Sequence, residues 1–120
     1  MVLVDTSVWV QHLRQGSAVL SHLLTDGEVV CHPFIVGELA CGNLKNRSEI
    51  LALLSSLPCA EVAGPEEVLH FIEAYRLMGR GLGYVDLHLL ASAVLTGVPL
   101  WTLDRRLRQT AGRLNLAYLV

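Results

Sequence analysis

Short apolar runs that alternate with helix-like segments are the feature that most constrains how this chain can fold. Val2–Val4 is followed directly by Asp5, and residues 29–31 follow an Asp-Gly turn. Residues 99–102 are followed, after one more residue, by Asp104. Apolar runs of this length, bounded by turn residues, are typical of buried strands. Because segments with apolar residues at helical spacing separate these runs, the sequence predicts an α/β fold with a parallel sheet covered on both faces.

The remaining segments complete a three-layer architecture. We expect helices over residues 8–15, 17–25, 33–42, 48–56, 65–78, 85–96 and 105–111. Two more short strands are expected at residues 60–62 and 117–119, which gives a central, mainly parallel sheet of four to five strands with helices on both faces. A length of 120 residues without a linker, repeat or low-complexity stretch predicts one domain over residues 1–120.

Composition and charge exclude several classes of protein. Hydrophobic residues make up 52% of the chain and charged residues only 17%, which excludes a disordered chain. No apolar run is long enough to span a bilayer and no basic, apolar leader is visible, so we expect a cytoplasmic protein. The three cysteines form no paired motif, which favours reduced thiols. The net charge of −2 argues against a protein that coats nucleic acid by charge alone.

Four of the eleven acids stand in apolar surroundings: Asp5, Glu38, Asp86 and Asp104. A carboxylate in such a setting is costly unless it is paired, hydrogen-bonded or bound to a metal ion. Each acid also has a purely structural explanation. Asp5 can satisfy the turn after its strand, Asp104 can cap the next helix, and Asp86 can occupy the first turn of another helix. Glu38, in the middle of a helix, can form an ion pair with an arginine.

Taken together, the four acids favour a cation site. No basic residue lies within five positions of Asp5 or Glu38. Ligands of parallel α/β sheets bind beyond the carboxyl ends of the strands, which is where Asp5 and Asp104 stand. Mg²⁺ and Mn²⁺ prefer oxygen ligands, and the chemistry that uses such carboxylate sites is mainly phosphoryl transfer.

Four sequence motifs carry a resemblance to a known family. They are Val-Asp-Thr-Ser-Val-Trp at residues 4–9, Gly-Glu-Leu at 37–39, Val-Asp-Leu-His-Leu-Leu-Ala-Ser-Ala at 85–93 and Leu-Trp-Thr-Leu-Asp-Arg-Arg-Leu at 100–107. With these motifs in this order, the chain resembles the PIN-domain ribonucleases, and more narrowly the VapC-type toxins of type II toxin–antitoxin pairs. The resemblance covers essentially the whole chain and implies a PIN-like three-layer fold.

The resemblance also implies an activity and a set of site residues. The expected activity is hydrolysis of RNA phosphodiester bonds by an endoribonuclease that depends on Mg²⁺ or Mn²⁺. The matching catalytic acids are Asp5, Glu38, Asp86 and Asp104. Of these, Asp5, Asp86 and Asp104 are the expected metal ligands, and Glu38 is either a ligand or a group that orients water. The matching hydroxyls, which would aim the carboxylates by hydrogen bonds, are Thr6, Ser7 and Thr102.

The expected partners are an RNA substrate, a small cognate antitoxin protein and a second copy of the chain. Arg80, Arg105 and Arg106 are candidates for contact with RNA or with the protein partner. Three other functions remain open. A PIN-like domain can be catalytically silent and serve as a binding module. A phosphorelay receiver or a haloacid-dehalogenase-like phosphatase would instead use Asp5 as a phosphate acceptor, although the second acid that both require near Asp5 is missing.

Overall fold

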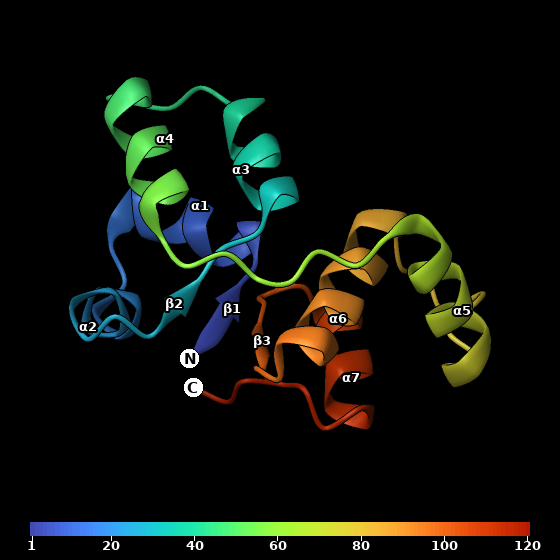
Figure 1. Ribbon diagram of the computed structural model, residues 1–120. Coiled ribbons are helices and arrows are strands. Elements are labelled where there is room, and N and C mark those ends of the chain that lie inside the picture. Colours follow the sequence, from blue (N-terminus) through green and yellow to red (C-terminus); the bar gives the residue numbers. More distant parts are fainter.

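The computed structural model describes residues 1–120 and consists of seven helices around a three-stranded parallel sheet (Figure 1). The strands are β1 (Val2–Val4), β2 (Val29–Val30) and β3 (Leu100–Trp101), and β1 lies between the other two. The register pairs Leu3 with Val30 on one side and with Leu100 on the other. All three carboxyl ends therefore meet at one edge of the sheet.

The sheet has three strands where four to five were expected. The two expected edge strands are reduced to single parallel bridges, Cys31 to Cys59 and Leu100 to Ala117. Beyond the first of these bridges the backbone donors turn away from the sheet, because the amide of Glu61 donates to Thr96 Oγ1. The amide of the residue two positions later, Ala63, donates to a serine hydroxyl of the neighbouring helix. Side chains of a helix thus take the hydrogen bonds that a longer edge strand would have used.

The helices cover both faces of the sheet, as predicted. In Figure 1 the first four lie on one side of the sheet and the last three on the other. Their bounds are α1 (Thr6–Gln15), α2 (Ala18–Thr25), α3 (Pro33–Ala40), α4 (Arg47–Ser56), α5 (Pro65–Tyr75), α6 (Tyr84–Thr96) and α7 (Arg105–Arg113).

Local sequence signals set several helix starts. Pro33 and Pro65 occupy first-turn positions of α3 and α5, where a missing N–H costs nothing. Asp104 precedes α7, and its Oδ1 accepts a hydrogen bond from the amide of Leu107 at 2.9 Å. Helix α1 begins two residues earlier than expected because Asp5, and not one of the hydroxyl residues after it, is the residue that precedes the helix.

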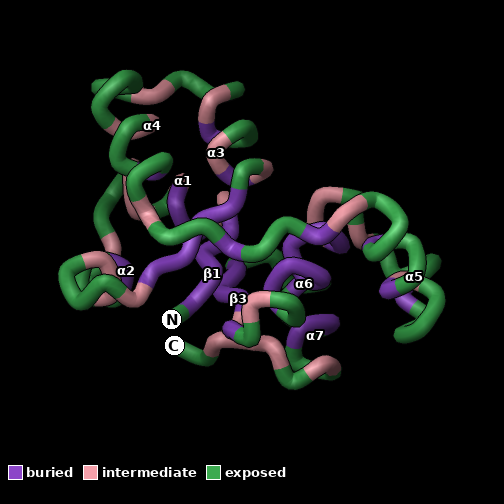
Figure 2. The backbone as a smooth tube through the Cα atoms, viewed as in Figure 1, coloured by how far each residue is buried: buried purple, intermediate pink, exposed green.

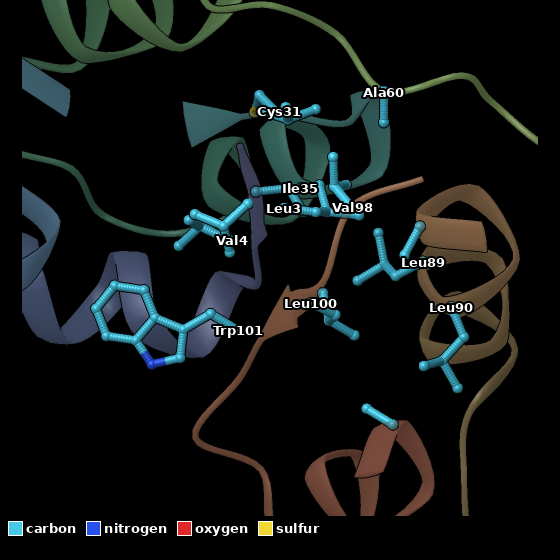
Figure 3. Close-up of a cluster of buried hydrophobic side chains, with 14 of the residues drawn as sticks. Leu3, Val4, Cys31, Ile35, Ala60, Leu89, Leu90, Val98, Leu100 and Trp101 are labelled. Carbon is cyan, nitrogen blue, oxygen red and sulfur yellow. The ribbon is translucent and has the colours of Figure 1, made fainter. Parts of the chain in front are cut away.

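The core lies on both faces of the strands. Figure 2 shows the strands and α6 as the most buried part of the chain. In Figure 3, Leu100 points towards α6 while Trp101 leaves the strand on the opposite face, as the alternation of a strand requires. Residues 87–93 of α6 are all buried, whereas Val94 and Leu95 at its end are exposed. The helix is therefore buried all round only over its middle turns, since Tyr84 at its start is also exposed.

No helix in the structure is both long enough and apolar enough to cross a membrane. The longest helix, α6, has 13 residues, whereas a bilayer requires ~20.

Candidate active site

The four acids that stand in apolar surroundings in the sequence lie on segments that leave the carboxyl edge of the sheet. Asp5 follows β1 directly, and Asp104 follows β3 after two residues. Glu38 lies on α3, the helix that comes after β2, and Asp86 lies in the first turn of α6. Since the three strands are parallel, the segments after them all start from one edge, and this edge is where α/β sheets bind their ligands.

Asp5 is the most buried of the four acids, with 7% of its surface exposed. Its Oδ2 accepts hydrogen bonds from Ser7 Oγ at 2.8 Å and from Thr102 Oγ1 at 2.7 Å. The side chain accepts no capping hydrogen bond from a backbone amide of α1, although Asp5 occupies the capping position. The carboxylate is therefore held by two hydroxyls and is not used to terminate the helix.

Three hydroxyls connect the segments that carry Asp5, Glu38 and Asp104. Thr6 Oγ1 donates to Glu38 Oε1 at 2.7 Å, which ties α3 to the residue after Asp5. Thr102 Oγ1, while it donates to Asp5, accepts from the amide of Asp104 at 3.0 Å. Ser7 Oγ accepts from the amide of residue 103 and lies 3.3 Å from Thr102 Oγ1. These contacts make the first helix, α3 and the segment after β3 one hydrogen-bonded unit.

Glu38 has no arginine partner. The chain contains one ion pair, between the amino group of Met1 and Glu28, and it lies outside the site. The structural explanation considered for Glu38, an ion pair with an arginine, is therefore not what the structure contains. Its one hydrogen bond comes from a neutral hydroxyl, so its negative charge remains uncompensated.

The Asp86 carboxyl lies within electrostatic range of the other three acids. Burial raises the pKa of its carboxyl above the usual value, and the charges of Asp5, Asp104 and Glu38 raise it further. The hydrogen bond from the amide of Gly83 to Oδ2, at 3.1 Å, acts in the opposite direction. No basic side chain contributes to the shift, so the other three carboxylates lie close enough to Asp86 to repel its charge, and none of the four forms an ion pair.

In each of the four carboxylates, one oxygen accepts a hydrogen bond from the protein and the other does not. One oxygen accepts from the protein, namely Asp5 Oδ2, Glu38 Oε1, Asp86 Oδ2 and Asp104 Oδ1. The second oxygen of each carboxylate has no protein donor. For Asp5 the free Oδ1 also reaches solvent, since it is not among the fully buried side-chain atoms without a partner. The local structure thus fixes each side chain through one oxygen and leaves the other free for a ligand.

The residues fit a hard divalent cation in donor type and in charge. All four free donors are carboxylate oxygens, which Mg²⁺ and Mn²⁺ prefer, and no basic residue competes for them. As the side chains stand, no three His, Cys, Asp or Glu residues are grouped tightly enough to hold an ion. Binding therefore requires the free oxygens to converge, and the attraction for that movement would come from the charge of the ion.

A buried histidine supports the helix that carries Glu38. The amide of Phe34 donates to His32 Nδ1 at 3.0 Å, so the proton of the neutral ring is on Nε2, which lies 3.1 Å from Ser92 Oγ of α6. Burial lowers the pKa of His32 to about 4, and the nearby His88 adds to that effect. His88 is itself packed between the rings of Phe34 and Tyr84. Both imidazole rings are thus packed against other side chains inside the fold.

The three arginines proposed from the sequence lie in different settings. Arg80 donates from Nε to the carbonyl of Arg76 at 3.0 Å and so helps to end α5. Arg105 and Arg106 are exposed in the first turn of α7, directly after Asp104. Gly83 was not among the residues expected at the site. Its signal was the spacing Gly-x-x-Asp, in which the acid at the third helical position bonds back to the amide before the helix.

Comparisons with known proteins agree with this geometry. The family model described as the PIN domain matches residues 2–113. Two proteins named Ribonuclease VapC32, from the CDC 1551 and H37Rv strains of Mycobacterium tuberculosis, are each 47% identical to the chain over 118 residues. The match covers 98% of this chain and 95% of each relative.

A solved structure shares the fold. The crystal structure of PAE2754 from Pyrobaculum aerophilum superimposes with a TM-score of 0.60 and covers 95% of this chain and 88% of that one, at 21% identity. The family model and the two relatives span nearly the whole sequence. The chain therefore belongs to the PIN-domain family and, within that family, to the VapC type.

Proposed function

We propose that this chain is a divalent-metal-dependent endoribonuclease and the toxin of a type II toxin–antitoxin pair. The observation that carries the proposal is the set of four carboxylates at one edge of the sheet, each with one free oxygen and none with a basic partner. The name of the relatives from M. tuberculosis, Ribonuclease VapC32, supports RNA as the substrate. The reaction is hydrolysis of an RNA phosphodiester bond.

In this proposal Asp5, Asp86 and Asp104 hold Mg²⁺ or Mn²⁺. When bound, the ion would lower the pKa of a water molecule and offset the charge of the phosphate. Ser7 and Thr102 keep Asp5 in place through Oδ2, which leaves Oδ1 for the ion. Glu38 is a ligand or orients the attacking water through Oε2, while Thr6 fixes its other oxygen.

The proposed protein partner is a small cognate antitoxin. A groove beside Glu38 runs between α1 and the segment after α3, and its walls combine apolar side chains, Val10 and Leu13 among them, with the basic Arg14 and Lys45. An amphipathic segment with an acidic edge suits such a groove, and a basic side chain at its end would reach the acids. We also propose that the chain is a single domain over residues 1–120, forms a homodimer and acts in the cytoplasm.

The proposal is tested by an RNA cleavage assay on the purified chain, freed of any bound partner. Bulk transfer RNA and a pool of structured RNAs are incubated with Mg²⁺, with Mn²⁺ and with chelator. The variants are Asp5→Asn, which removes a proposed ligand, and Asp26→Asn, a matched change at an exposed acid that follows α2, away from the carboxyl edge.

The expected result is cleavage at discrete sites with either metal, lost with chelator and with Asp5→Asn but retained with Asp26→Asn. Metal binding by calorimetry without any cleavage would move the assignment to a silent binding module. Covalent labelling of Asp5 by a small phosphate donor would favour a receiver-like or phosphatase-like protein. Neither metal binding nor cleavage would return the four acids to purely structural roles.

A further inference from the structure

A glycine of the loop before α6 makes room for an arginine of α7. Gly81 has φ +76°, and a Cβ placed there would clash with Arg106 Nη1 and lie 3.1 Å from both Cδ and Cζ. Both the aliphatic part and the guanidinium of Arg106 therefore pass through the space that a Gly81 Cβ would occupy or touch. Such close contact between a side chain and a backbone requires the absence of a Cβ.

This contact joins the two segments that carry Asp86 and Asp104. Arg106 comes two residues after Asp104 in the chain, and Gly81 comes two residues before Gly83, whose amide holds Asp86. The arginine is anchored on its own helix because the next residue, Leu107, is fully buried. The Arg106 side chain thus lies between the loop that leads to Asp86 and the helix that follows Asp104.

Arg106 has no partner of its own within the chain. The single ion pair of the structure does not involve Arg106, and the Arg106 side chain makes no hydrogen bond. Arg80, in contrast, donates its Nε–H to a backbone carbonyl. The five N–H donors of Arg106 are therefore free, and a guanidinium with free donors binds a phosphate through two parallel hydrogen bonds.

The charge of the site explains why a cation is needed at its margin. Four carboxylates carry a formal charge of −4, and one divalent ion reduces this to −2, so a phosphodiester is still repelled. An arginine beside the carboxylates, but not paired with them, attracts the phosphate without blocking the ligands of the metal ion.

We propose that Arg106 binds a backbone phosphate of the RNA and that Gly81 is a positioning residue which holds the Arg106 guanidinium in place for this contact. The proposal rests on the proposed nuclease function. It selects RNA over the protein partner as the ligand of this arginine, and it assigns a role to a loop residue that touches neither the substrate nor the metal ion.

The loop supplies its own control. Gly79 lies two residues earlier with φ +70°, and a Cβ there would meet nothing within 4 Å. Gly79→Ala and Gly81→Ala thus carry a comparable backbone strain, but only the second displaces Arg106. The other variants are Arg106→Gln, Arg106→Lys and the double variant Gly81→Ala/Arg106→Gln.

Binding is measured by fluorescence anisotropy with a labelled short single-stranded RNA in Mg²⁺, over a series of salt concentrations. Every protein carries Asp5→Asn so that the probe stays intact. Arg106→Gln is expected to weaken binding about tenfold and to reduce the slope of log affinity against log salt by about 0.7, the value for one lost phosphate contact. Arg106→Lys is expected to keep the slope and part of the affinity.

Gly81→Ala is expected to follow Arg106→Gln in affinity and slope, while Gly79→Ala matches the parent protein in both. The double variant is expected to bind no more weakly than Arg106→Gln alone, because the two changes remove one interaction. Equal effects of the two glycine variants, or an unchanged salt slope with Arg106→Gln, would overturn the proposal. Cleavage is measured separately in proteins that keep Asp5. If the parent cleaves RNA and Arg106→Gln has the same KM as the parent, the role of Arg106 is refuted while the nuclease function stands. If the parent does not cleave RNA, the result counts against the nuclease function itself.

Discussion

Replacing Thr102 by valine tests how far the buried hydroxyls support the acidic site. Thr102 is 2% exposed, and its Oγ1 donates to Asp5 Oδ2 at 2.7 Å while it accepts from the amide of Asp104 at 3.0 Å. Valine has almost the same shape but can make neither bond. A hydrogen bond to a charged group contributes about 1.5–3 kcal/mol, so we expect the free energy of unfolding to fall by about 2 kcal/mol.

Thermal unfolding of the metal-free protein measures this loss directly. A domain of this size shifts its midpoint by about 4 °C for each kcal/mol, which predicts a decrease of about 8 °C for Thr102→Val. Thr110→Val is the matched control, because Thr110 is also buried, at 5% exposed, but its hydroxyl makes no hydrogen bond in the structure. This control is expected to change the midpoint by no more than about 2 °C.

The same variant tests the link between the hydroxyl and the metal ion. Loss of a side chain that aims a ligand typically weakens metal binding about 10–100-fold. Isothermal titration of Mn²⁺ into Thr102→Val is therefore expected to give at least a tenfold weaker affinity, with Thr110→Val unchanged. Equal midpoints for the two valine variants, together with an unaltered Mn²⁺ affinity, would refute the reasoning that the hydroxyl orients Asp5.

Three further perturbations test other contacts of the structure. Asp86→Asn is expected to raise the unfolding midpoint of the metal-free protein in calorimetric scans, because it removes repulsion from the other carboxylates. It is also expected to abolish the stabilisation by Mn²⁺, which is about 2.7 kcal/mol for a ligand at one hundred times its dissociation constant. A lower metal-free midpoint would contradict this reasoning. His32 has a folded pKa of about 4, below its unfolded value near 6.5, so stability is expected to be complete above pH ~6.5 and to fall by up to about 3 kcal/mol as the pH decreases to ~4. Urea unfolding over that range should show this slope, and His32→Asn should flatten it; identical slopes in both proteins would exclude His32 as the source. Leu100→Ala, at a residue 1% exposed in the central sheet, is expected to cost about 2–5 kcal/mol in urea unfolding, whereas Leu119→Ala, at 82% exposed, should cost less than about 0.5 kcal/mol.

The acidic site depends on features that local sequence patterns already contain. Two of the acids, Asp86 and Asp104, stand at helix starts, where a backbone amide holds one of their oxygens. The structural roles considered for Asp86 and Asp104 are therefore real, and they do not compete with a role as metal ligand. The same backbone amide that anchors such a carboxylate also fixes the direction of its free oxygen.

The sequence by itself determined the alternation of strands and helices, the starts of the proline-led helices and the identity of the four acids. These features depend on neighbours within a few positions, such as Pro33 at a helix start or the Gly83–Asp86 spacing, and such short-range preferences can be seen in the chain directly.

Only the tertiary structure decided which partners these residues meet. Thr6 bonds to Glu38 across 32 positions of sequence, and Thr102 bonds to Asp5 across 97. Both expected edge strands are single bridges, and at residues 60–62 this is because side chains of α6 accept the backbone hydrogen bonds that follow. The contact between Arg106 and Gly81 likewise joins α7 to the loop before α6. Contacts of this range depend on how whole elements pack, and no local periodicity or turn signal specifies them.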